Sequence, residues 1–407
     1  MGGVSMEWKE VRLGDVCNII TGFPFPGKKY SKEGIRVVRG DNVTIGNLRW
    51  DAEKDKRWNE PFDKTEYYSL QANDIVIGMD GSRVGKNKAR IKEEDLPLLL
   101  AQRVACVRHN ELAEQDYLYY NIFSKKFIDY VNSIHTGSAI PHISQKQIED
   151  YKILLPDLET QRRIASMLSS LDRKIELNKK INADLEEMAQ AIFKNWFVDF
   201  EPFKDGKFVD SELGMIPEGW KVGTLGDITK NKSAKVKERN DVKVLSPVTT
   251  GELVLSEEYF TKQVFSSSIA KYKIVNKGDF AYNPARVNIG SLGRNEFDFD
   301  GCVSPVYVVF SVLDGYENYF DLFRKTDFFK DSVASLAIGG VRQSLSYDDL
   351  SSIEVIIPSE NAVEEFNNLY NQMKKTIKAN KLENSRLSTL RDTLLPRLMS
   401  GELEVPE

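Results

Sequence analysis

A short basic stretch, residues 83–92, holds the side chains with the clearest chemical potential in this 407-residue sequence. The stretch includes glycine but no acidic residue, and its cationic and amide members are Arg83, Lys86, Asn87, Lys88, Arg90 and Lys92. Lysine and arginine contact phosphates, while arginine pairs with guanine edges and asparagine with adenine edges. We therefore interpret the stretch as a candidate contact with a nucleic acid, the alternative being a solvated charged face.

A loop of similar composition recurs in the second half of the sequence, where we expect further contacts. Its candidate residues are Asn283, Arg286, Asn288 and Arg294, and an earlier basic run adds Lys230, Lys232, Lys235, Lys237 and Arg239. Recurrence at a matching place favours nucleic-acid contacts over a charged face. Such local clusters are needed, because a net charge of −5 by itself disfavours a nucleic-acid binder.

Two polar turns, each preceding a long helical segment, supply the remaining candidates. The first turn holds Ser138, His142 and Gln145, and the second holds Arg342, Gln343 and Ser344. Each of these residues could instead cap a helix or form a turn, because short polar side chains hydrogen-bond to nearby backbone. Both interpretations stay open at the level of sequence.

Residue patterns typical of catalysis are incomplete in this sequence. The segment from Gly81 to Asn87 resembles a phosphate-binding loop but is one residue short, and Asn87 stands where Ser or Thr would bind magnesium. Asn283-Pro284 lacks the second proline and the aromatic residue of the turn found in amino-methyltransferases. No glycine-rich cofactor-binding turn follows a plausible first strand. We therefore expect no catalytic residue and no cofactor bound by this chain.

Cysteine and histidine usage predicts neither a disulfide framework nor a metal site. Cys17, Cys106 and Cys302 are far apart, and the three histidines share no ligand spacing. No apolar run approaches the ~20 residues that cross a bilayer, and the start of the sequence lacks a signal-peptide pattern. We expect a cytoplasmic protein that makes no membrane contact and keeps its cysteines reduced.

Two long helical segments, residues 156–200 and 358–399, must position these loops. In each segment, seam residues recur at alternating steps of four and three over more than four heptads, which predicts supercoiling against another helix. The first seam consists of Ile164, Leu168, Leu171, Ile175, Asn178, Asn182, Leu185, Ala189, Ile192 and Trp196. The second, 202 positions later, consists of Phe366, Tyr370, Met373, Ile377, Asn380, Asn384, Leu387, Arg391, Leu394 and Leu398.

The middle of each seam is polar: Asn178 and Asn182 in the first, Asn380 and Asn384 in the second. A polar residue at a seam position lowers stability and fixes the register. Antiparallel pairing would set Asn178 near Asn384 and Asn182 near Asn380. Parallel pairing would also bring asparagine to asparagine, so the feature fixes the stagger and leaves the direction open. The alternative is that these residues are solvated flanks of two unrelated helices.

The sequence contains two copies of one unit, a globular part followed by a long helix. Trp8 and Trp220 begin similar segments, and Asp74-Ile75 is matched by Asp279-Phe280. We place the globular domains at residues 1–156 and 201–358 and the long helices at residues 157–200 and 359–407.

Each globular part combines two kinds of periodicity. Short β-branched or aromatic runs predict strands at residues 74–77, 103–108, 273–275 and 303–310. Helical periodicity is found at residues 115–133 and 316–336. The expected fold class is therefore α+β, with an internal repeat and a turn-rich connection at residues 199–218.

Several motifs resemble the specificity subunit of type I restriction-modification enzymes. Leu-Leu-Pro-Asp-Leu-Glu-Thr-Gln-Arg-Arg-Ile-Ala, beginning at Leu154, starts the first long helix, and Leu-Leu-Pro-Arg-Leu-Met-Ser-Gly, beginning at Leu394, closes the second. The His-Ile-Ser-Gln turn at His142 and the Leu-Gly-Asp segments at Leu13 and Leu225 are also similar to that family. The resemblance covers nearly the whole chain and includes the order of its parts.

This resemblance implies two target-recognition domains, each reading one half of a split, asymmetric sequence in double-stranded DNA. It also implies that the helices form a spacer, an antiparallel coiled coil with pseudo-two-fold symmetry, and bind two methyltransferase subunits, which restriction (translocase) subunits then join. Those partners would bring S-adenosylmethionine, ATP and magnesium, and the chain itself would be non-catalytic. The second helix begins at Pro358-Ser359-Glu360 without the Gln-Arg-Arg triplet of the first, so the two docking faces need not be equivalent.

The dimensions of a helix agree with such a spacer. About forty residues of helix span roughly 60 Å, compared with about 34 to 36 Å for one turn of B-DNA. The alternative is a coiled-coil scaffold that holds two protein-binding heads and does not bind DNA. Salt dependence distinguishes the two, because a protein that contacts several phosphates loses affinity steeply as salt rises.

Overall fold

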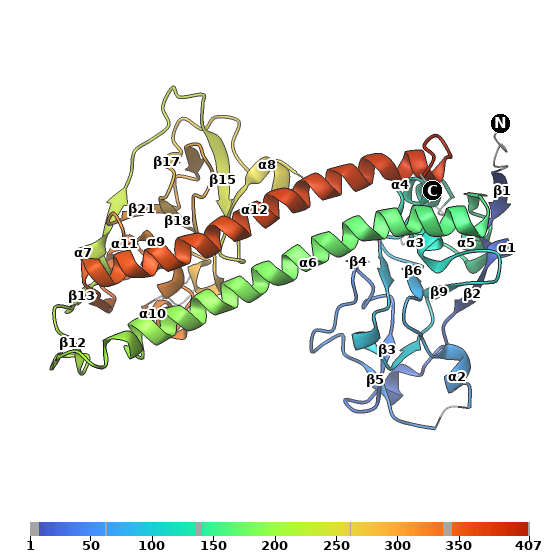
Figure 1. Cartoon of the computed structure of the whole chain (residues 1–407), viewed down its shortest axis with the longest axis horizontal. Helices are drawn as coiled ribbons and strands as arrows, with labels where there is room; N and C mark the ends of the chain where they lie inside the picture. The colour runs from blue at the N-terminus through green and yellow to red at the C-terminus, as the bar shows by residue number, and fades with distance from the viewer. Residues whose placement is uncertain (1–7, 62, 135–140, 261, 337–343, 406–407) are drawn as a thin grey trace. The chain divides into compact units, whose positions relative to one another are not determined.

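The structure, a computed structural model, describes residues 8–61, 63–134, 141–260, 262–336 and 344–405 (Figure 1). The chain divides into two compact units, unit 1 (residues 1–178 and 381–407) and unit 2 (residues 179–380). Two long helices, α6 (Leu158–Phe197) and α12 (Glu360–Met399), contribute to both units and are green and red in Figure 1. The division falls inside these helices, whereas the domain boundaries predicted from sequence lie at their ends.

Packing explains where the units divide. In unit 1, Ile164 of α6 and Leu398 of α12 are buried in one cluster with Tyr117. In unit 2, Phe193 of α6 and Phe366 of α12 are buried in the largest cluster of that unit. Each half of a long helix thus belongs to the core of its own globular part.

The main sheet of unit 1 has five strands in the order β2-β9-β6-β7-β4. Neighbouring strands are antiparallel except for β4 and β7, which are parallel. The strands are β2 (Cys17–Thr21), β4 (Ile45–Gly46), β6 (Ile75–Gly78), β7 (Lys88–Arg90) and β9 (Val104–His109). All four residues of β6 are buried. Ile75 and Ile77 pack in one core and Val76 in another, because successive side chains of a strand face opposite sides.

Two smaller sheets complete unit 1. Strand β1 (Lys9–Arg12) pairs antiparallel with β10 (Lys152–Leu155), the strand that leads into α6. Strands β5 (Arg57–Trp58), β3 (Ile35–Val38) and β8 (Leu98–Leu100) form a three-stranded sheet. The short helices are α1 (Leu13–Val16), η1 (Gly27–Lys29), α2 (Thr65–Tyr68), η2 (Glu93–Asp95), α3 (Gln115–Phe123), α4 (Lys125–Ile134) and α5 (Gln145–Glu149).

Unit 2 repeats the pairing that precedes the long helix, since β13 (Lys221–Thr224) pairs antiparallel with β22 (Glu354–Ile357) before α12. One four-stranded sheet has β14 (Thr229–Lys232), β21 (Val308–Val312), β18 (Phe280–Tyr282) and β19 (Leu292–Arg294) in that order. A second has β16 (Leu253–Leu255), β15 (Lys243–Pro247), β20 (Gly301–Val303) and β17 (Lys273–Val275).

The remaining elements of unit 2 are short. Strands β11 (Phe208–Val209) and β12 (Ile216–Pro217) form a small antiparallel pair in the connection from α6. The short helices are η3 (Glu201–Phe203), α7 (Leu225–Ile228), α8 (Ser256–Tyr259), η4 (Val287–Ile289), α9 (Glu317–Phe323), α10 (Asp327–Leu336) and α11 (Tyr347–Ser351).

Most elements expected from periodicity are present, with two refinements. The helical stretches at residues 115–133 and 316–336 are each two helices, α3 with α4 and α9 with α10. The stretch at residues 303–310 contains the end of β20 and the start of β21, joined by a turn in which Tyr307 N donates to Ser304 O (3.0 Å). Pro305 lies in this turn, where its missing N–H removes no ladder hydrogen bond.

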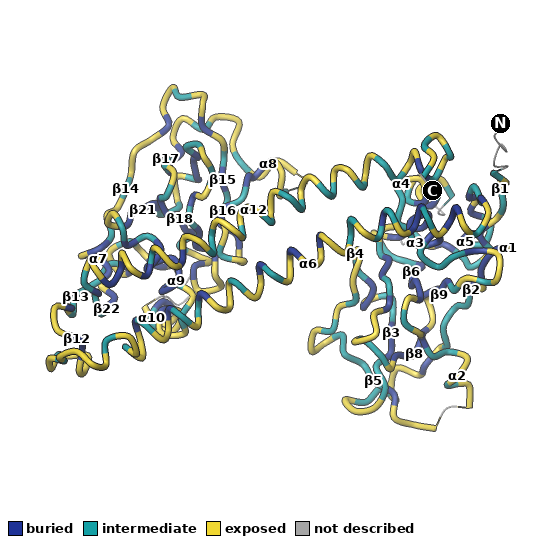
Figure 2. The backbone as a smooth tube through the Cα atoms, in the orientation of Figure 1, coloured by how far each residue is buried: buried dark blue, intermediate teal, exposed yellow. Residues whose placement is uncertain are grey.

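Burial along the long helices follows the heptad seams. Every seam residue named from the sequence is buried or partly buried, and exposed residues lie between them (Figure 2). Exposed segments alternate with buried or partly buried ones along α6 and α12 in Figure 2, as the 3.5-residue period requires.

Candidate nucleic-acid interface

The loop after β6, residues 79–87, forms a tightly turned surface of unit 1. Lys86 N donates to Arg83 O (3.0 Å). Gly85 has a φ of +78°, and a Cβ at this residue would lie 2.9 Å from the Val131 side chain, so the turn requires glycine. Asn87 is partly buried, whereas Arg83 and Lys86 are exposed. These two cations can therefore meet phosphates.

Lys88 lies in the same basic stretch but points inward. Its side chain is buried, and its Nζ donates to Ile122 O (2.7 Å) and lies 5.3 and 5.1 Å from the ring centroids of Phe123 and Phe127. Burial lowers the pKa of Lys88 to about 7. Lys88 therefore does not face a ligand in this structure, in contrast to the interpretation from sequence, because it lies opposite Ile77, on the face of the sheet where its side chain meets α3 and α4.

Arg90, two residues further along β7, is partly exposed and engaged within unit 1. It forms an ion pair with Asp116, donates to Asn73 Oδ1 (3.1 Å), and lies 5.3 Å from the ring centroid of Tyr119. These contacts tie β7 to α3. Of the five cations in this basic stretch, only Arg83, Lys86 and Lys92 are exposed.

The matching loop of unit 2, residues 283–291, is also a constrained turn. Asn283 Oδ1 accepts from Ala285 N (3.1 Å). Gly290 has a φ of +93°, and a Cβ there would lie 2.7 Å from Thr249 O. Arg286 and Asn288 are exposed on this loop, which therefore presents a cation and an amide to solvent.

Two other cations of unit 2 that were predicted to contact a nucleic acid instead form contacts within the fold. Lys232 Nζ contacts both carboxylate oxygens of the buried Asp279 (2.7 and 2.9 Å). Burial raises the pKa of Asp279, against the opposing effect of Lys232. Arg294 donates to Asn318 Oδ1 (3.0 Å). Lys235 and Lys237 are exposed, and their contact with a nucleic acid stays a prediction.

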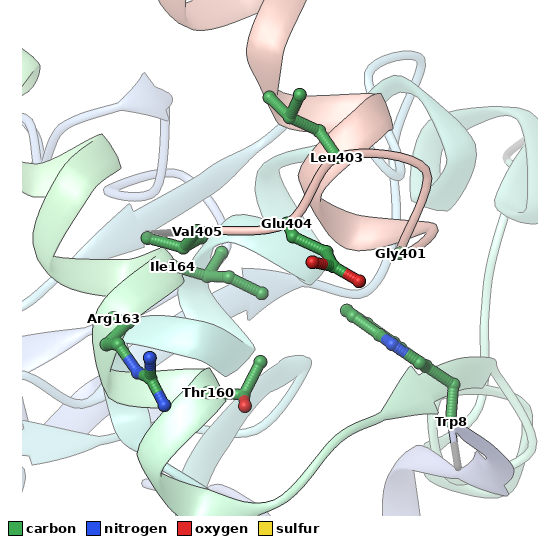
Figure 3. A pocket seen from close by; sticks show the side chains of 8 residues that line it. All are labelled: Trp8, Thr160, Arg163, Ile164, Gly401, Leu403, Glu404 and Val405. Atoms are coloured by element: carbon green, nitrogen blue, oxygen red, sulfur yellow. The ribbon is translucent and has the colours of Figure 1, made fainter. Parts of the chain in front are cut away.

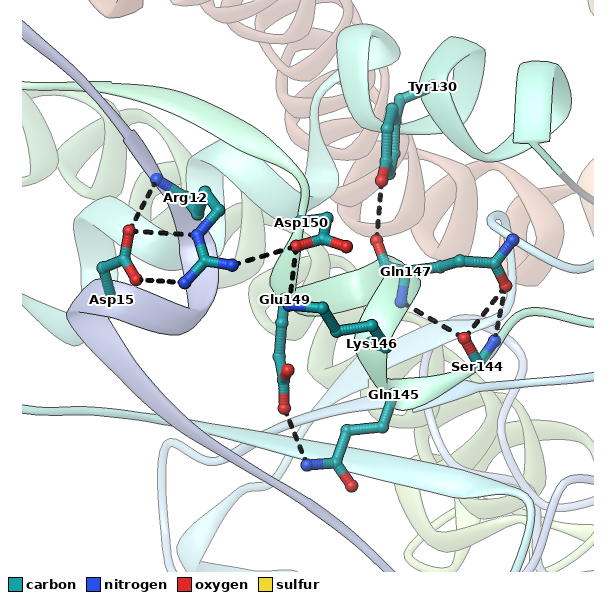
Figure 4. Close-up of polar contacts among 9 residues, drawn as sticks. All are labelled: Arg12, Asp15, Tyr130, Ser144, Gln145, Lys146, Gln147, Glu149 and Asp150. Atoms are coloured by element: carbon teal, nitrogen blue, oxygen red, sulfur yellow. Dashed lines mark hydrogen bonds and ion pairs between the residues drawn. The ribbon is translucent and has the colours of Figure 1, made fainter.

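The turn before α5 serves mainly to organise backbone (Figure 4). Ser144 Oγ accepts from Gln147 N (3.2 Å), forming a helix cap, and Tyr130 donates to Gln147 O (2.7 Å). Gln145 donates to Ile19 O (2.9 Å). His142 is exposed and keeps its candidate role, whereas Ser138, Arg342 and Gln343 lie outside the described residues.

The same backbone hydrogen bond joins this turn to the candidate loop in both units. Ile143 N donates to Met79 O (2.9 Å) in unit 1, and Leu345 N donates to Pro284 O (3.1 Å) in unit 2. Both donors are fully buried. The two loops thus begin at corresponding places, directly after the central strands β6 and β18.

Sequence reasoning missed an exposed cation beside the loop of unit 1. Arg103 Nη1 donates to Asp80 Oδ2 (2.7 Å), and 61% of the Arg103 side chain is exposed. Asp80 belongs to the candidate loop, so Arg103 lies beside the loop that carries Arg83. The two partners are 23 positions apart, and no local pattern in the sequence links them.

The seam asparagines are in contact in both units. In unit 1, Asn178 Nδ2 donates to Asn384 Oδ1 (3.0 Å) and to Glu383 Oε2 (2.7 Å). In unit 2, Asn380 Nδ2 donates to Asn182 Oδ1 (2.9 Å). Within each unit the residue number rises along one helix as it falls along the other, so the paired segments run antiparallel.

A second polar contact crosses the seam in unit 1. Arg391 Nη1 donates to Asp172 Oδ1 (2.7 Å), and Tyr120 donates to Asp172 Oδ2 (2.7 Å). Arg391 is the one cationic seam residue, and this pair satisfies its charge. The contact also ties α3 to both long helices.

The Gln-Arg-Arg triplet at the start of α6 contributes to internal structure. Gln161 is fully buried, donates to Leu112 O (3.2 Å) and Pro156 O (2.9 Å), and accepts from Glu114 N (2.9 Å). In unit 2, Asn367 donates to Gly315 O (2.6 Å). Different residues therefore fasten each long helix to its globular part.

Arg163 lines a cavity of about 210 Å³ in unit 1 (Figure 3). Trp8, the first turns of α6 and the segment after α12 surround it, including Glu404. The first and last described segments of the chain therefore lie around this cavity, beside the beginning of α6.

Membrane-spanning helices and metal-binding clusters are both absent from the described residues. None of the helices there is long and apolar enough to span a membrane. No group of three or more His, Cys, Asp or Glu side chains in that part of the chain could hold a metal ion.

Comparison with known proteins points to one family. The sequence model of the family "Type I restriction modification DNA specificity domain" matches residues 6–187. The Methanocaldococcus jannaschii type I restriction enzyme MjaIX specificity subunit is 30% identical over 304 residues, which cover 72% of this chain and 70% of that protein. The Haemophilus influenzae HindI specificity subunit is 24% identical over 98% of this chain and 100% of its own length.

A solved structure shares the fold. The S subunit of a type I restriction-modification system from M. genitalium superposes with a TM-score of 0.60 and 16% sequence identity, covering 98% of this chain and 97% of that chain. At this identity, the similarity concerns the fold alone.

Proposed function

Because the chain belongs to the family of DNA specificity subunits of type I restriction-modification enzymes, we propose that its two α+β parts are target-recognition domains that each read one half of a split, asymmetric DNA sequence. The family assignment makes the chain the DNA-recognition subunit, not a catalytic one. It also sets aside the scaffold that does not bind DNA.

The observation that carries this proposal is the pair of corresponding loops with unlike side chains. Each loop follows a central strand and is tied by the same backbone hydrogen bond, Ile143 to Met79 or Leu345 to Pro284. The first loop exposes Arg83 and Lys86, and the second exposes Arg286 and Asn288. Unlike side chains at equivalent places suit two different half-sites.

We further propose that α6 and α12 form an antiparallel coiled coil with pseudo-two-fold symmetry that acts as the spacer. Asparagine pairs in both units and the burial of both seams support this. Interlocked seam residues resist sliding, so the spacer would have a fixed length.

The partners in this proposal are two methyltransferase subunits on the helices and the restriction subunits that join them. Exposed apolar side chains offer contact area on the helices: Leu177, Leu382 and Leu390 in unit 1, and Met188 and Leu369 in unit 2. S-adenosylmethionine, ATP and magnesium would belong to these partners. The complex would work in the cytoplasm, where the DNA is.

The test is to express the full chain together with the methyltransferase encoded beside its gene and to sequence the methylated positions in host DNA. We expect a split motif with two unlike halves. A continuous palindromic motif would contradict two unlike recognition domains. The purified chain alone, given labelled S-adenosylmethionine and DNA, should transfer no methyl group, and adding the methyltransferase should restore transfer.

A further inference from the structure

The turn before β9 in unit 1 holds an arginine in an unfavourable backbone conformation. Arg103 has a φ of +69°, in the left-handed region that glycine adopts most easily. Non-glycine residues held in this region cluster at functional sites. Glycine would fit this turn with less strain, so the arginine side chain deserves a functional explanation.

The guanidinium of Arg103 is held at one nitrogen and exposed elsewhere. Nη1 donates to Asp80 Oδ2 (2.7 Å), and no other side-chain hydrogen bond of Arg103 is found within the described part of the chain. The Asp80 side chain is 21% exposed, compared with 61% for Arg103. Asp80 is itself fixed by a backbone bridge to His142. A pre-oriented guanidinium with free donors is suited to paired hydrogen bonds with a planar acceptor edge.

The cations beside Arg103 would orient the first recognition domain on the DNA duplex. Arg83 and Lys86 are exposed on the loop that contains Asp80. Phosphate contacts by such residues orient a protein on the duplex without reading its sequence. Arg103, anchored by a carboxylate at the same edge, is then placed to meet base edges.

We propose that Arg103 is a specificity-determining residue of the first recognition domain and that it recognises a guanine through the O6 and N7 atoms in the major groove. Arginine with these two acceptors is the most common specific protein–DNA contact. This inference rests on the proposed function and names one residue that carries it out.

The corresponding turn of unit 2 presents different chemistry. Ala105 lies opposite Ile77, and Val308 lies opposite Tyr282, the residue that matches Ile77. Two positions earlier in the sequence, before β9 and β21 begin, are Arg103 and Val306. Val306 is 72% exposed, and an aliphatic side chain suits the methyl group of thymine. The guanine is therefore assigned to the half-site of the first domain alone.

The experiment uses the full chain, co-expressed and purified with its methyltransferase subunits, and a duplex library randomised in both half-sites. Bound duplexes are sequenced for wild type, Arg103→Ala and Arg103→Lys. With Arg103→Ala we expect the preference for one guanine in one half-site to fall about 10- to 100-fold, with the other half-site unchanged. Arg103→Lys should lose most of the same preference, because an ammonium lacks the planar fork.

Matched variants separate base recognition from charge. Arg83→Ala should weaken binding to all sequences without altering the motif. Asp80→Asn should reduce the same guanine preference by a smaller factor. If Arg103→Ala does not fold, Asp80→Asn and Arg103→Lys together test the assignment of Arg103. Thermal unfolding of each complex checks folding.

The possible outcomes distinguish a failure of the Arg103 assignment from a failure of the proposed function. A wild-type complex that selects no sequence would overturn both. A wild-type motif that survives unchanged in Arg103→Ala would overturn only the assignment of Arg103. Uniform weakening by Arg103→Ala, with full recovery in Arg103→Lys, would make Arg103 a phosphate contact and would also overturn the assignment.

Discussion

Asn178 on α6 donates a hydrogen bond to Asn384 on α12 across 3.0 Å, from a position that is fully buried. The Oδ1 atom of Asn178 is buried without a partner among the described residues. A buried amide oxygen without a partner lowers stability, so this pair favours one register of the two helices at a cost in stability.

We predict strong coupling between these two asparagines. Asn178→Leu alone should lower the free energy of unfolding by about 1–3 kcal/mol, because Asn384 loses its donor. The double variant Asn178→Leu, Asn384→Leu should recover this loss, and denaturant unfolding of all four proteins gives the interaction energy. Asn182→Leu with Asn380→Leu is the matched cycle in unit 2. Additive effects in the first cycle would contradict the coupling.

Salt dependence should separate exposed from buried cations of one basic stretch. Affinity of the complex for its DNA should fall steeply with salt, and Arg83→Ala and Lys86→Ala should each reduce the slope of log affinity against log salt by about 1. Lys88→Met is the matched control, because Lys88 is buried. A slope changed by Lys88→Met, or unchanged by both surface variants, would argue against this placement. Fluorescence anisotropy with a labelled duplex measures all four.

The long helices and their stagger could be predicted from sequence because a heptad repeat depends only on local spacing. Asn178 and Asn384 occupy the same seam position in two copies, so their meeting follows from the pattern. Helix direction could not be predicted, because parallel pairing brings asparagines together as well. Only contacts such as Asp172 with Arg391 determine it.

The candidate loops were also predictable, but the direction of their side chains was not. Lys88 lies opposite Ile77 in the pairing of β7 with β6, and shifting this register by one residue would turn Lys88 to the other face of the sheet, where Ala89 now packs. Sequence does not determine that register. Arg103 was missed for a related reason: its partner Asp80 is brought close only when β6 and β9 pair.

Burial of Lys88 makes stability depend on pH. Its pKa is about 7 when folded, against an ordinary value of 10.5. Between about pH 7 and pH 10.5 the unfolded chain holds a proton at this lysine that the folded protein has released, so the free energy of unfolding should rise with pH, by up to about 1.4 kcal/mol per unit. Below pH 7 both states are protonated and this contribution is constant.

Lys88→Met should remove that rise. Urea unfolding at pH 7, 8 and 9 should show wild type gaining stability relative to Lys88→Met as pH increases. Lys86→Met, an exposed lysine two residues away, should keep the wild-type trend. If Lys88→Met and wild type change in parallel, the lysine titrates normally in the folded protein.

The spacer hypothesis predicts that the length of the helices determines the gap between half-sites. Seven residues inserted between Asn182 and Leu185, with seven more between Ile377 and Asn380, would keep both seams in phase because each insertion is one heptad. Each adds about 10 Å of helix, or about three base pairs of duplex. We therefore expect the complex to prefer a gap about three base pairs longer, measured by binding to duplexes that differ only in gap length.

Two controls make this prediction specific. Replacing seven residues at the same places, without changing length, should leave the preferred gap as in wild type. Inserting the heptad into α6 alone lengthens only one of the two helices, so the asparagine pairs and the packing of α6 in unit 2 cannot both be kept, and binding should weaken at every gap. If the double insertion binds tightly at the original gap, the helices do not set the spacing, and the two domains must be placed by their partner subunits instead.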